Sequence, residues 1–180
     1  MMKQVLTIMG MGSLIMGMGL PLVYGQEGET ASIPITVTLD EVLVLTVPDP
    51  LSFTLVPAPW DTQVVSAVLE IATNAEGGYT LATMIDHQLA EGGDSQPDSI
   101  PAWRGEIDQP TSWSEEISGF GFSLDGGETY AGFPTEETIL LSGEQSNGRV
   151  VSLDYRVTAS SSLDAGTYTA TITYSVVARF

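Results

Sequence analysis

The chain has 180 residues, enough for one domain with a hydrophobic core of its own. It carries 23 acidic and five basic residues, so its net charge at pH 7 is −18. Such a charge repels nucleic acids and anionic membrane surfaces, and we expect neither as a partner. The sequence has no cysteine and a single histidine, His87, which excludes disulfides and leaves little material for zinc sites or imidazole-based catalysis.

The first 25 residues have the pattern of a secretory signal peptide. Lys3 supplies a short positive region, an uncharged stretch begins at Val5, Pro21 ends any helix, and small or medium residues lead up to Gly25. We predict export with cleavage after Gly25, so that the mature protein is extracellular, at the cell surface and outside the membrane. The alternative is an uncleaved anchor, because the uncharged stretch is just long enough to cross a bilayer.

A flexible leader and a single folded domain are predicted after the signal peptide. The leader, residues 26–32, is polar and contains two glutamates. The domain, residues 33–180, opens with Ile33–Leu39, in which every second residue is apolar. Two further apolar runs follow: one starts at Val42 and the other covers Leu51–Val56. Each of the three runs predicts a strand.

Longer alternating segments follow, and they indicate the fold class. Gln63–Thr73, Val150–Thr158 and the C-terminal Tyr168–Phe180 each place apolar residues on one face and polar residues on the other. Gly- and Pro-containing turns separate the segments, and no helical period occurs after the signal peptide. We therefore predict an all-β protein: an antiparallel β-sandwich of about nine to ten strands, Ig-like or jelly-roll-like.

The segment Asp86–Gly119 interrupts the alternation and is predicted to be a long loop. It contains Trp103 and Trp113, while Trp60 follows a Pro-Ala-Pro sequence earlier in the chain. Exposed aromatic side chains in loops suit glycan stacking or protein contacts. We predict burial for Trp113, because phenylalanines follow it closely. Trp60 and Trp103 remain candidates for ligand contact, with burial as the alternative.

Asp125-Gly-Gly-Glu128 lies between two short apolar runs and predicts a hairpin turn, because consecutive glycines supply positive φ angles. Asp125 and Glu128 also offer the oxygen ligands that calcium prefers, so a calcium site is the second interpretation. The spaced motif of calcium loops is missing, which favours the plain turn. No motif for a nucleophile, a metalloprotease, phosphate or a dinucleotide occurs, and we predict a non-enzymatic protein without a cofactor.

Three passages resemble a family of secreted bacterial proteins. They run from Asn74 to Thr83, from Trp113 to Gly127, and from Asp164 to Val176. Together they are similar to WxL-domain surface proteins, which are secreted β-sandwich proteins with two W-x-L motifs on strands. Some members of that family bind peptidoglycan non-covalently and act in surface complexes.

The two motif positions contain tyrosine in place of both tryptophans, because they read Tyr79-Thr80-Leu81 and Tyr174-Ser175-Val176. The resemblance implies a structural or adhesive function at a bacterial surface, with a cell-wall polymer or other surface proteins as partners. From the residues alone, Tyr79 and Leu81 share one strand face, as do Tyr174 and Val176, so all four are core candidates.

The last strand also resembles the end of spore-coat-protein-U-type and pilus-like secreted domains. In such systems, subunits can polymerise by lending a strand to a neighbour's sheet. This second resemblance implies homo-assembly, and the alternating segment Ile33–Leu39 would be the donor.

Overall fold

The computed structural model describes residues 36–91 and 99–180. The predicted signal peptide, the leader and the first three residues of Ile33–Leu39 lie outside the described residues. The remaining residues of that predicted strand are described, and they form no strand. The chain divides into a unit of residues 1–38 and a unit of residues 39–180, and all described strands belong to the second. Within the described ranges, no helix is long and apolar enough to span a membrane.

The described residues form eleven strands, against the nine to ten predicted. In chain order these are β1 (Leu43–Thr46), β2 (Trp60–Thr73), β3 (Tyr79–Ile85), β4 (Leu89–Glu91), β5 (Ser99–Ile100), β6 (Gly119–Ser123), β7 (Ala131–Gly132), β8 (Thr138–Gly143), β9 (Ser146–Ser160), β10 (Tyr168–Thr169) and β11 (Ile172–Ala178). All pairs between them are antiparallel, which confirms the predicted all-β antiparallel class.

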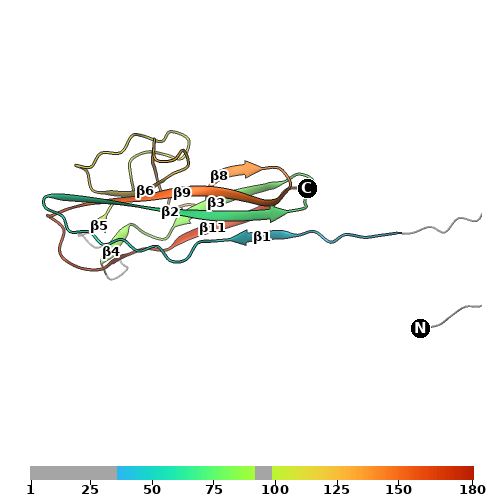
Figure 1. Ribbon diagram of the computed structural model, residues 1–180, viewed down its shortest axis with the longest axis horizontal. Helices are drawn as coiled ribbons and strands as arrows, with labels where there is room; N and C mark the ends of the chain where they lie inside the picture. Colours follow the sequence, from blue (N-terminus) through green and yellow to red (C-terminus); the bar gives the residue numbers. More distant parts are fainter. Residues whose placement is uncertain (1–35, 92–98) are drawn as a thin grey trace, which may run out of the picture. The chain divides into compact units, whose positions relative to one another are not determined.

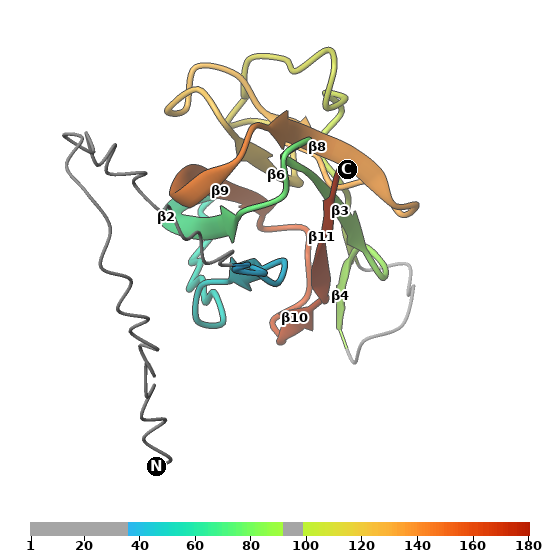
Figure 2. The same cartoon turned by 90° about the vertical axis from the view of Figure 1, so that its right-hand side faces the viewer.

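The strands form one larger and two smaller sheets. The five-stranded sheet has the order β1-β2-β9-β6-β7, and the three-stranded sheets have the orders β11-β3-β8 and β10-β4-β5 (Figure 1). Seen end-on, β2 and β9 lie on one side of the unit, and β3, β4 and β11 lie on the other (Figure 2).

β2 and β9 form the longest ladder, from Trp60 opposite Ser160 to Thr73 opposite Ser146. Its inward and outward faces are those that the alternation predicts. Leu69 is fully buried, whereas the preceding Val68 is 53% exposed. This contrast follows from the period of two in a strand, which sends neighbouring side chains to opposite faces.

One hydrophobic core joins the sheets. Tyr79 and Leu81 of β3 are fully buried, and Tyr155 of β9 and Phe122 of β6 approach them from the five-stranded sheet. Phe133 lies between these contributions, with its ring centroid 4.6 Å from that of Phe122 and 6.1 Å from that of Tyr155.

The structure corrects the prediction of one long loop over Asp86–Gly119. The segment contains β4 and β5, and Ala102 and Thr111 form isolated bridges to Phe120 and Tyr130. These pairings are at most three residues long. A periodic pattern needs a longer run to become visible in the sequence, so the prediction missed them.

The predicted strand Leu51–Val56 is extended and alternates between half-buried and exposed residues, but it belongs to no ladder. Side chains at the start of β2 replace the partner strand. The Thr54 amide donates to Gln63 Oε1 at 3.1 Å, the Gln63 side-chain amide donates back to the Thr54 carbonyl, and the Val56 amide donates to Asp61 Oδ2 at 2.7 Å. Two prolines on each side of the segment lack the backbone N–H groups that a ladder requires.

The predicted C-terminal strand is present but divided into β10 and β11. At the division, the Thr171 amide donates to Asp86 Oδ1 at 2.8 Å, and the Asp86 amide donates to the Thr171 carbonyl at 3.1 Å. Asp86 itself lies in the gap between β3 and β4. The break between β3 and β4 therefore lies beside the break between β10 and β11, and Asp86 bonds to Thr171 across the two breaks.

Replacing Leu153, which is 1% exposed in the core, tests the assignment of faces on the central ladder. Leu153→Ala should lower the free energy of unfolding by about 2–5 kcal/mol, because it removes buried apolar contacts and leaves a cavity. Val150→Ala, on the same strand but 60% exposed, should change it by less than about 0.5 kcal/mol. Urea unfolding followed by circular dichroism measures both, and equal losses would contradict the assignment.

Candidate functional site

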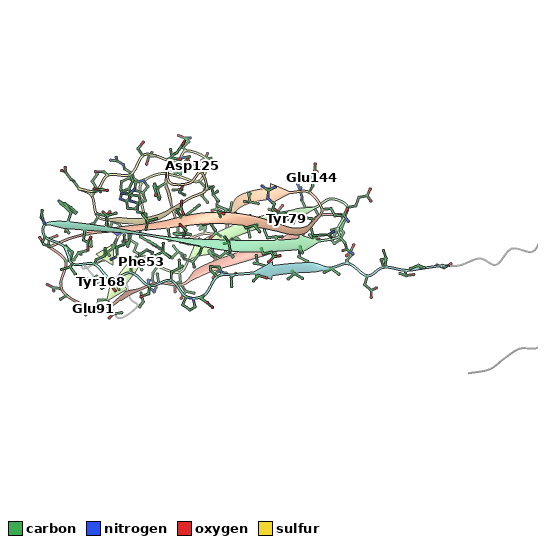
Figure 3. The ribbon with its side chains drawn as sticks, in the orientation of Figure 1. Phe53, Tyr79, Glu91, Asp125, Glu144 and Tyr168 are labelled. Carbon is green, nitrogen blue, oxygen red and sulfur yellow. The ribbon has the colours of Figure 1, made fainter. Side chains whose placement is uncertain are left out.

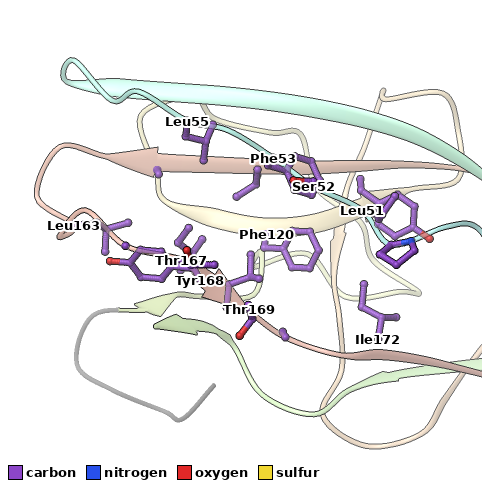
Figure 4. A pocket seen from close by; sticks show the side chains of 18 of the residues that line it. Leu51, Ser52, Phe53, Leu55, Phe120, Leu163, Thr167, Tyr168, Thr169 and Ile172 are labelled. Carbon is purple, nitrogen blue, oxygen red and sulfur yellow. The ribbon is translucent and has the colours of Figure 1, made fainter. Parts of the chain in front are cut away.

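A large apolar groove opens between residues 47–57 on one side and residues 163–174 on the other. Its volume is about 1240 Å³, beyond the ~300–1,000 Å³ of ordinary small-molecule pockets. Leu51, Phe53 and Leu55 line one wall, and Tyr168 and Ile172 are among the residues of the other (Figure 4). The groove thus lies between two segments that are distant in the sequence.

Tyr155 and Tyr174 join the two sides of the domain within the groove. Their hydroxyl oxygens lie 2.8 Å apart, which connects β9 of the five-stranded sheet to the edge strand β11. Burial raises the pKa of Tyr155, and it also raises the pKa of Tyr174, with a further contribution from the neighbouring Tyr155. Both hydroxyls therefore stay protonated, and the pair remains neutral.

β11 borders the groove with a free edge. Among the described residues it pairs with β3 alone. Thr171 and Arg179, just beyond its two ends, direct backbone hydrogen bonds to the β3 side. Because these groups alternate in an antiparallel pair, the N–H and C=O groups of Ile172, Tyr174 and Val176 point to the open edge. The side chains of these three residues face the core and are half-buried.

The two motif positions come together on neighbouring strands. Tyr79 and Leu81 of β3 are both 0% exposed, and Leu81 lies opposite Val176 of β11. Tyr174 and Val176 pack against the same core. All four residues therefore occupy the core positions that their shared strand faces predict.

Trp103 is not available for ligand contact, because it is only 4% exposed. Its ring stacks on Trp113 with centroids 4.1 Å apart, and its indole nitrogen donates to Thr111 Oγ1 at 3.0 Å. The prediction left burial open as the alternative for Trp103, and burial is what the structure shows. Trp60, at the start of β2, is 37% exposed and remains a candidate.

Trp113 is half-buried, so the burial predicted for it is only partial. Its indole nitrogen donates to Thr158 Oγ1 at 2.8 Å, and the Arg156 guanidinium lies 5.3 Å from its ring centre. Arg156 also forms an ion pair with Glu115 at 2.9 Å. This group of side chains covers part of the outer face of β9.

The Asp125-Gly-Gly-Glu128 sequence forms the predicted turn, since β6 pairs with β7 and Gly126 and Gly127 have φ angles of 76° and 89°. The Asp125 carboxylate accepts hydrogen bonds from the Ser123 hydroxyl, from the Thr129 hydroxyl and amide, and from the Glu128 amide. These bonds occupy both oxygens of Asp125. The part of the chain that the structure describes holds no group of three or more residues suited to a metal ion. The geometry therefore supports the turn, in which both Asp125 oxygens already accept hydrogen bonds.

Comparisons with known proteins identify no relative whose site could be compared with the groove. No protein-family model matches the sequence, and a search of curated proteins finds no match. The resemblance to WxL-domain and coat-like proteins accordingly rests on the sequence passages named above. Neither family resemblance predicts the groove. The groove depends on the spatial separation of residues 47–57 and 163–174, which the sequence does not reveal.

The role of Asp125 as the acceptor of the turn predicts a pH-dependent effect of Asp125→Ala. Hydrogen bonds from Ser123 and Thr129 hold the pKa of this carboxyl well below its usual range. A lowered pKa in the folded state stabilises the protein above the unfolded pKa of about 3.9, and this contribution is lost as the pH falls further. Asp125→Ala should therefore lower the melting temperature by a few degrees at pH 7 and by clearly less at pH 2.

Thermal unfolding at both pH values measures this difference. Glu128→Ala is the matched control, because Glu128 joins the turn through its backbone amide, and this change should leave the melting temperature nearly unaltered at either pH. An effect of Asp125→Ala that is equal at pH 7 and pH 2 would contradict the assignment.

Proposed function

We propose that the protein is an exported, non-enzymatic structural protein of a bacterial surface. In this proposal its folded unit is a β-sandwich that takes up an extended apolar polypeptide segment of another protein in its groove. The observation that carries the proposal is the combination of an apolar groove with the free edge of β11. A segment lying there gains backbone hydrogen bonds from β11 and buries its apolar side chains against the core.

The shape and chemistry of the groove favour a polypeptide over a small molecule. An extended chain rises about 3.3 Å per residue and fills a long opening that a compact ligand would leave partly empty. The outward N–H and C=O groups of Ile172 and Tyr174, which line the groove, are spaced for another backbone. Leu51, Leu55 and Ile172 present aliphatic side chains to the groove, and these suit the apolar side chains of a polypeptide.

The edge of β11 lacks the features that normally prevent pairing with another chain. Edges are usually protected by prolines, charged side chains or bulges. Four prolines follow β1 at the edge of the five-stranded sheet, and the pairing of β8 with β3 shifts register between Leu81 and Ala82. β11 contains neither a proline nor a charged residue, its pairing with β3 has no register shift, and no proline adjoins it. This difference supports the edge of β11 as the place where a partner adds a strand.

The resemblance to WxL-domain proteins supports the same general task, a structural or adhesive function with surface proteins as partners. Binding of a cell-wall polymer has less support, because Tyr79 and Leu81 are buried and Tyr174 bonds to Tyr155 inside the domain. Export is supported by the signal-peptide pattern of residues 1–25. The acidic composition suits a protein that must stay soluble and select its contacts.

A synthetic peptide tests whether the groove accepts an extended chain. A fluorescent peptide of four Thr-Val repeats with capped ends should bind the exported protein and raise its fluorescence anisotropy. The same peptide N-methylated at alternate residues should not bind, because it cannot form the ladder with β11. Equal binding of both peptides would contradict strand addition.

Two protein variants locate the binding. Leu163→Glu places a charge among the apolar side chains of the groove and should weaken binding of the Thr-Val peptide at least tenfold. Val177→Glu, on the opposite face of β11 at a position 62% exposed, should bind as the unaltered protein does. Circular dichroism of both variants checks that the fold is kept.

A further inference from the structure

We infer that the paired hydroxyls of Tyr155 and Tyr174 select a polypeptide segment with one inward amide or hydroxyl side chain, and that this side chain sets the register of the segment in the groove. The inference rests on the proposed function, because it names the kind of segment that the same groove accepts. It is carried by the place of the tyrosine pair in the groove and by hydrogen-bonding capacity that the folded unit leaves unused.

The tyrosine pair lies at one end of the groove. Tyr174 is the last residue of β11 that lines the groove, although β11 continues to Ala178. β1, which directly precedes the wall of residues 47–57, contacts β11, so the two walls approach each other on that side. Phe53 and Tyr168 of the groove lie toward one end of the folded unit, and Tyr79, opposite Ala178, lies toward the other (Figure 3). A segment in the groove therefore meets the pair near one of its own ends.

The inward side chains around the pair are apolar. Leu51, Phe120 and Ile172 line the groove and belong to the hydrophobic core or pack against it. Burial in these surroundings raises the pKa of both tyrosines, so their hydroxyls stay neutral. A charged side chain would lose its hydration there, whereas a neutral amide or hydroxyl needs only a hydrogen-bond partner.

The tyrosine pair can donate one more hydrogen bond than it makes. Each hydroxyl has one proton to donate and two lone pairs that accept. In their mutual bond of 2.8 Å, one hydroxyl donates and the other accepts. Within residues 36–91 and 99–180, this is the one hydrogen bond of the pair. The proton of the accepting hydroxyl is therefore available to an acceptor in the groove.

Thr83 adds a further hydroxyl behind the pair. It lies opposite Tyr174 in the β3–β11 ladder and is 1% exposed. Burial dominates the pKa of Tyr174, and the Thr83 hydroxyl is near enough to lower it, yet Thr83 Oγ1 is buried without a hydrogen-bond partner. Once the Tyr174 proton turns toward Thr83, the pair also accepts from a group in the groove. A side chain that both donates and accepts, an amide or a hydroxyl, matches this capacity best.

A polar side chain at this point fixes the register of the seated segment. An extended segment with identical apolar inward residues keeps its pattern when it shifts by two residues. If one inward residue is polar, the same shift moves it away from the tyrosines and among side chains such as Leu51 and Ile172. Both the polar group and the pair then lose a partner, and a buried polar group without a partner is costly.

A set of peptides tests the inference on the exported protein. Each valine of the Thr-Val peptide is replaced in turn by glutamine, and fluorescence anisotropy gives the Kd of each peptide. We expect one glutamine peptide to bind at least about fivefold more tightly than the Thr-Val peptide, because one position places the amide beside the tyrosines while the rest fills the groove. Leucine at the same position controls for side-chain size and should give no such gain.

A double variant locates the effect. Tyr155→Phe combined with Tyr174→Phe removes both hydroxyls together, so neither is left without its partner, and circular dichroism should show the fold kept. The gain from glutamine should disappear in this variant. Tyr168→Phe is the matched control, because Tyr168 also lines the groove but donates its hydroxyl proton to the Asp164 carbonyl at 2.9 Å. This variant should keep the gain.

The outcomes distinguish this inference from the proposed function. The inference is overturned when no glutamine peptide binds more tightly than the Thr-Val peptide, or when the gain persists in the double variant. In either case, binding of the Thr-Val peptide that N-methylation removes still supports the proposed function. Absence of binding by every peptide would contradict the proposed function, and the inference with it.

Discussion

The pairing of β2 with β9 is the interaction on which the rest of the structure depends. It is the longest ladder, and both flanks of the five-stranded sheet attach to it, β1 to β2 and β6 to β9. Its inner face supplies Leu69, Leu153 and Tyr155 to the core that the smaller sheets share. Without disulfides, this buried apolar face provides the main stabilisation of the folded unit.

The two flanks of this ladder are completed in different ways. On the β6 side, Trp103 packs against backbone so closely that a side chain at Gly132 would collide with its carbonyl oxygen. Trp113 and Arg156 cover the neighbouring outer face. On the β1 side, the chain continues as the extended Leu51–Val56 segment, whose backbone is held by Gln63 and Asp61 instead of a strand. β1 itself contacts β11, but the Leu51–Val56 segment that follows forms no ladder with it, and the groove lies between that segment and residues 163–174.

The sequence predicts the faces of strands better than the distances between them. Alternation identified the inward residues of β2, β9 and β11 correctly, because burial of one face is a local property of the pattern. The same pattern over Leu51–Val56 predicted a strand, since alternation does not reveal whether a neighbouring backbone lies within hydrogen-bonding distance. Tyr174 illustrates this limit as well: its pattern predicts a core position, but its half-exposed state depends on a segment more than a hundred residues earlier. Closely spaced glycines, such as Gly119 and Gly121, were an available signal for the burial of Trp103.

A free strand edge and an exposed alternating segment are each a hazard, because either can pair with unrelated chains. This chain contains both, whereas four prolines follow its edge strand β1 and its edge strand β8 pairs with a register shift. The net charge of −18 opposes random association between copies, so a contact must offer a neutral, matched surface to form. The groove beside β11 offers such a surface through Leu51, Leu55 and Leu163. An extended segment seated there would cover these side chains and pair with the outward backbone groups of Ile172 and Tyr174, so the contact that serves binding would also protect the free edge.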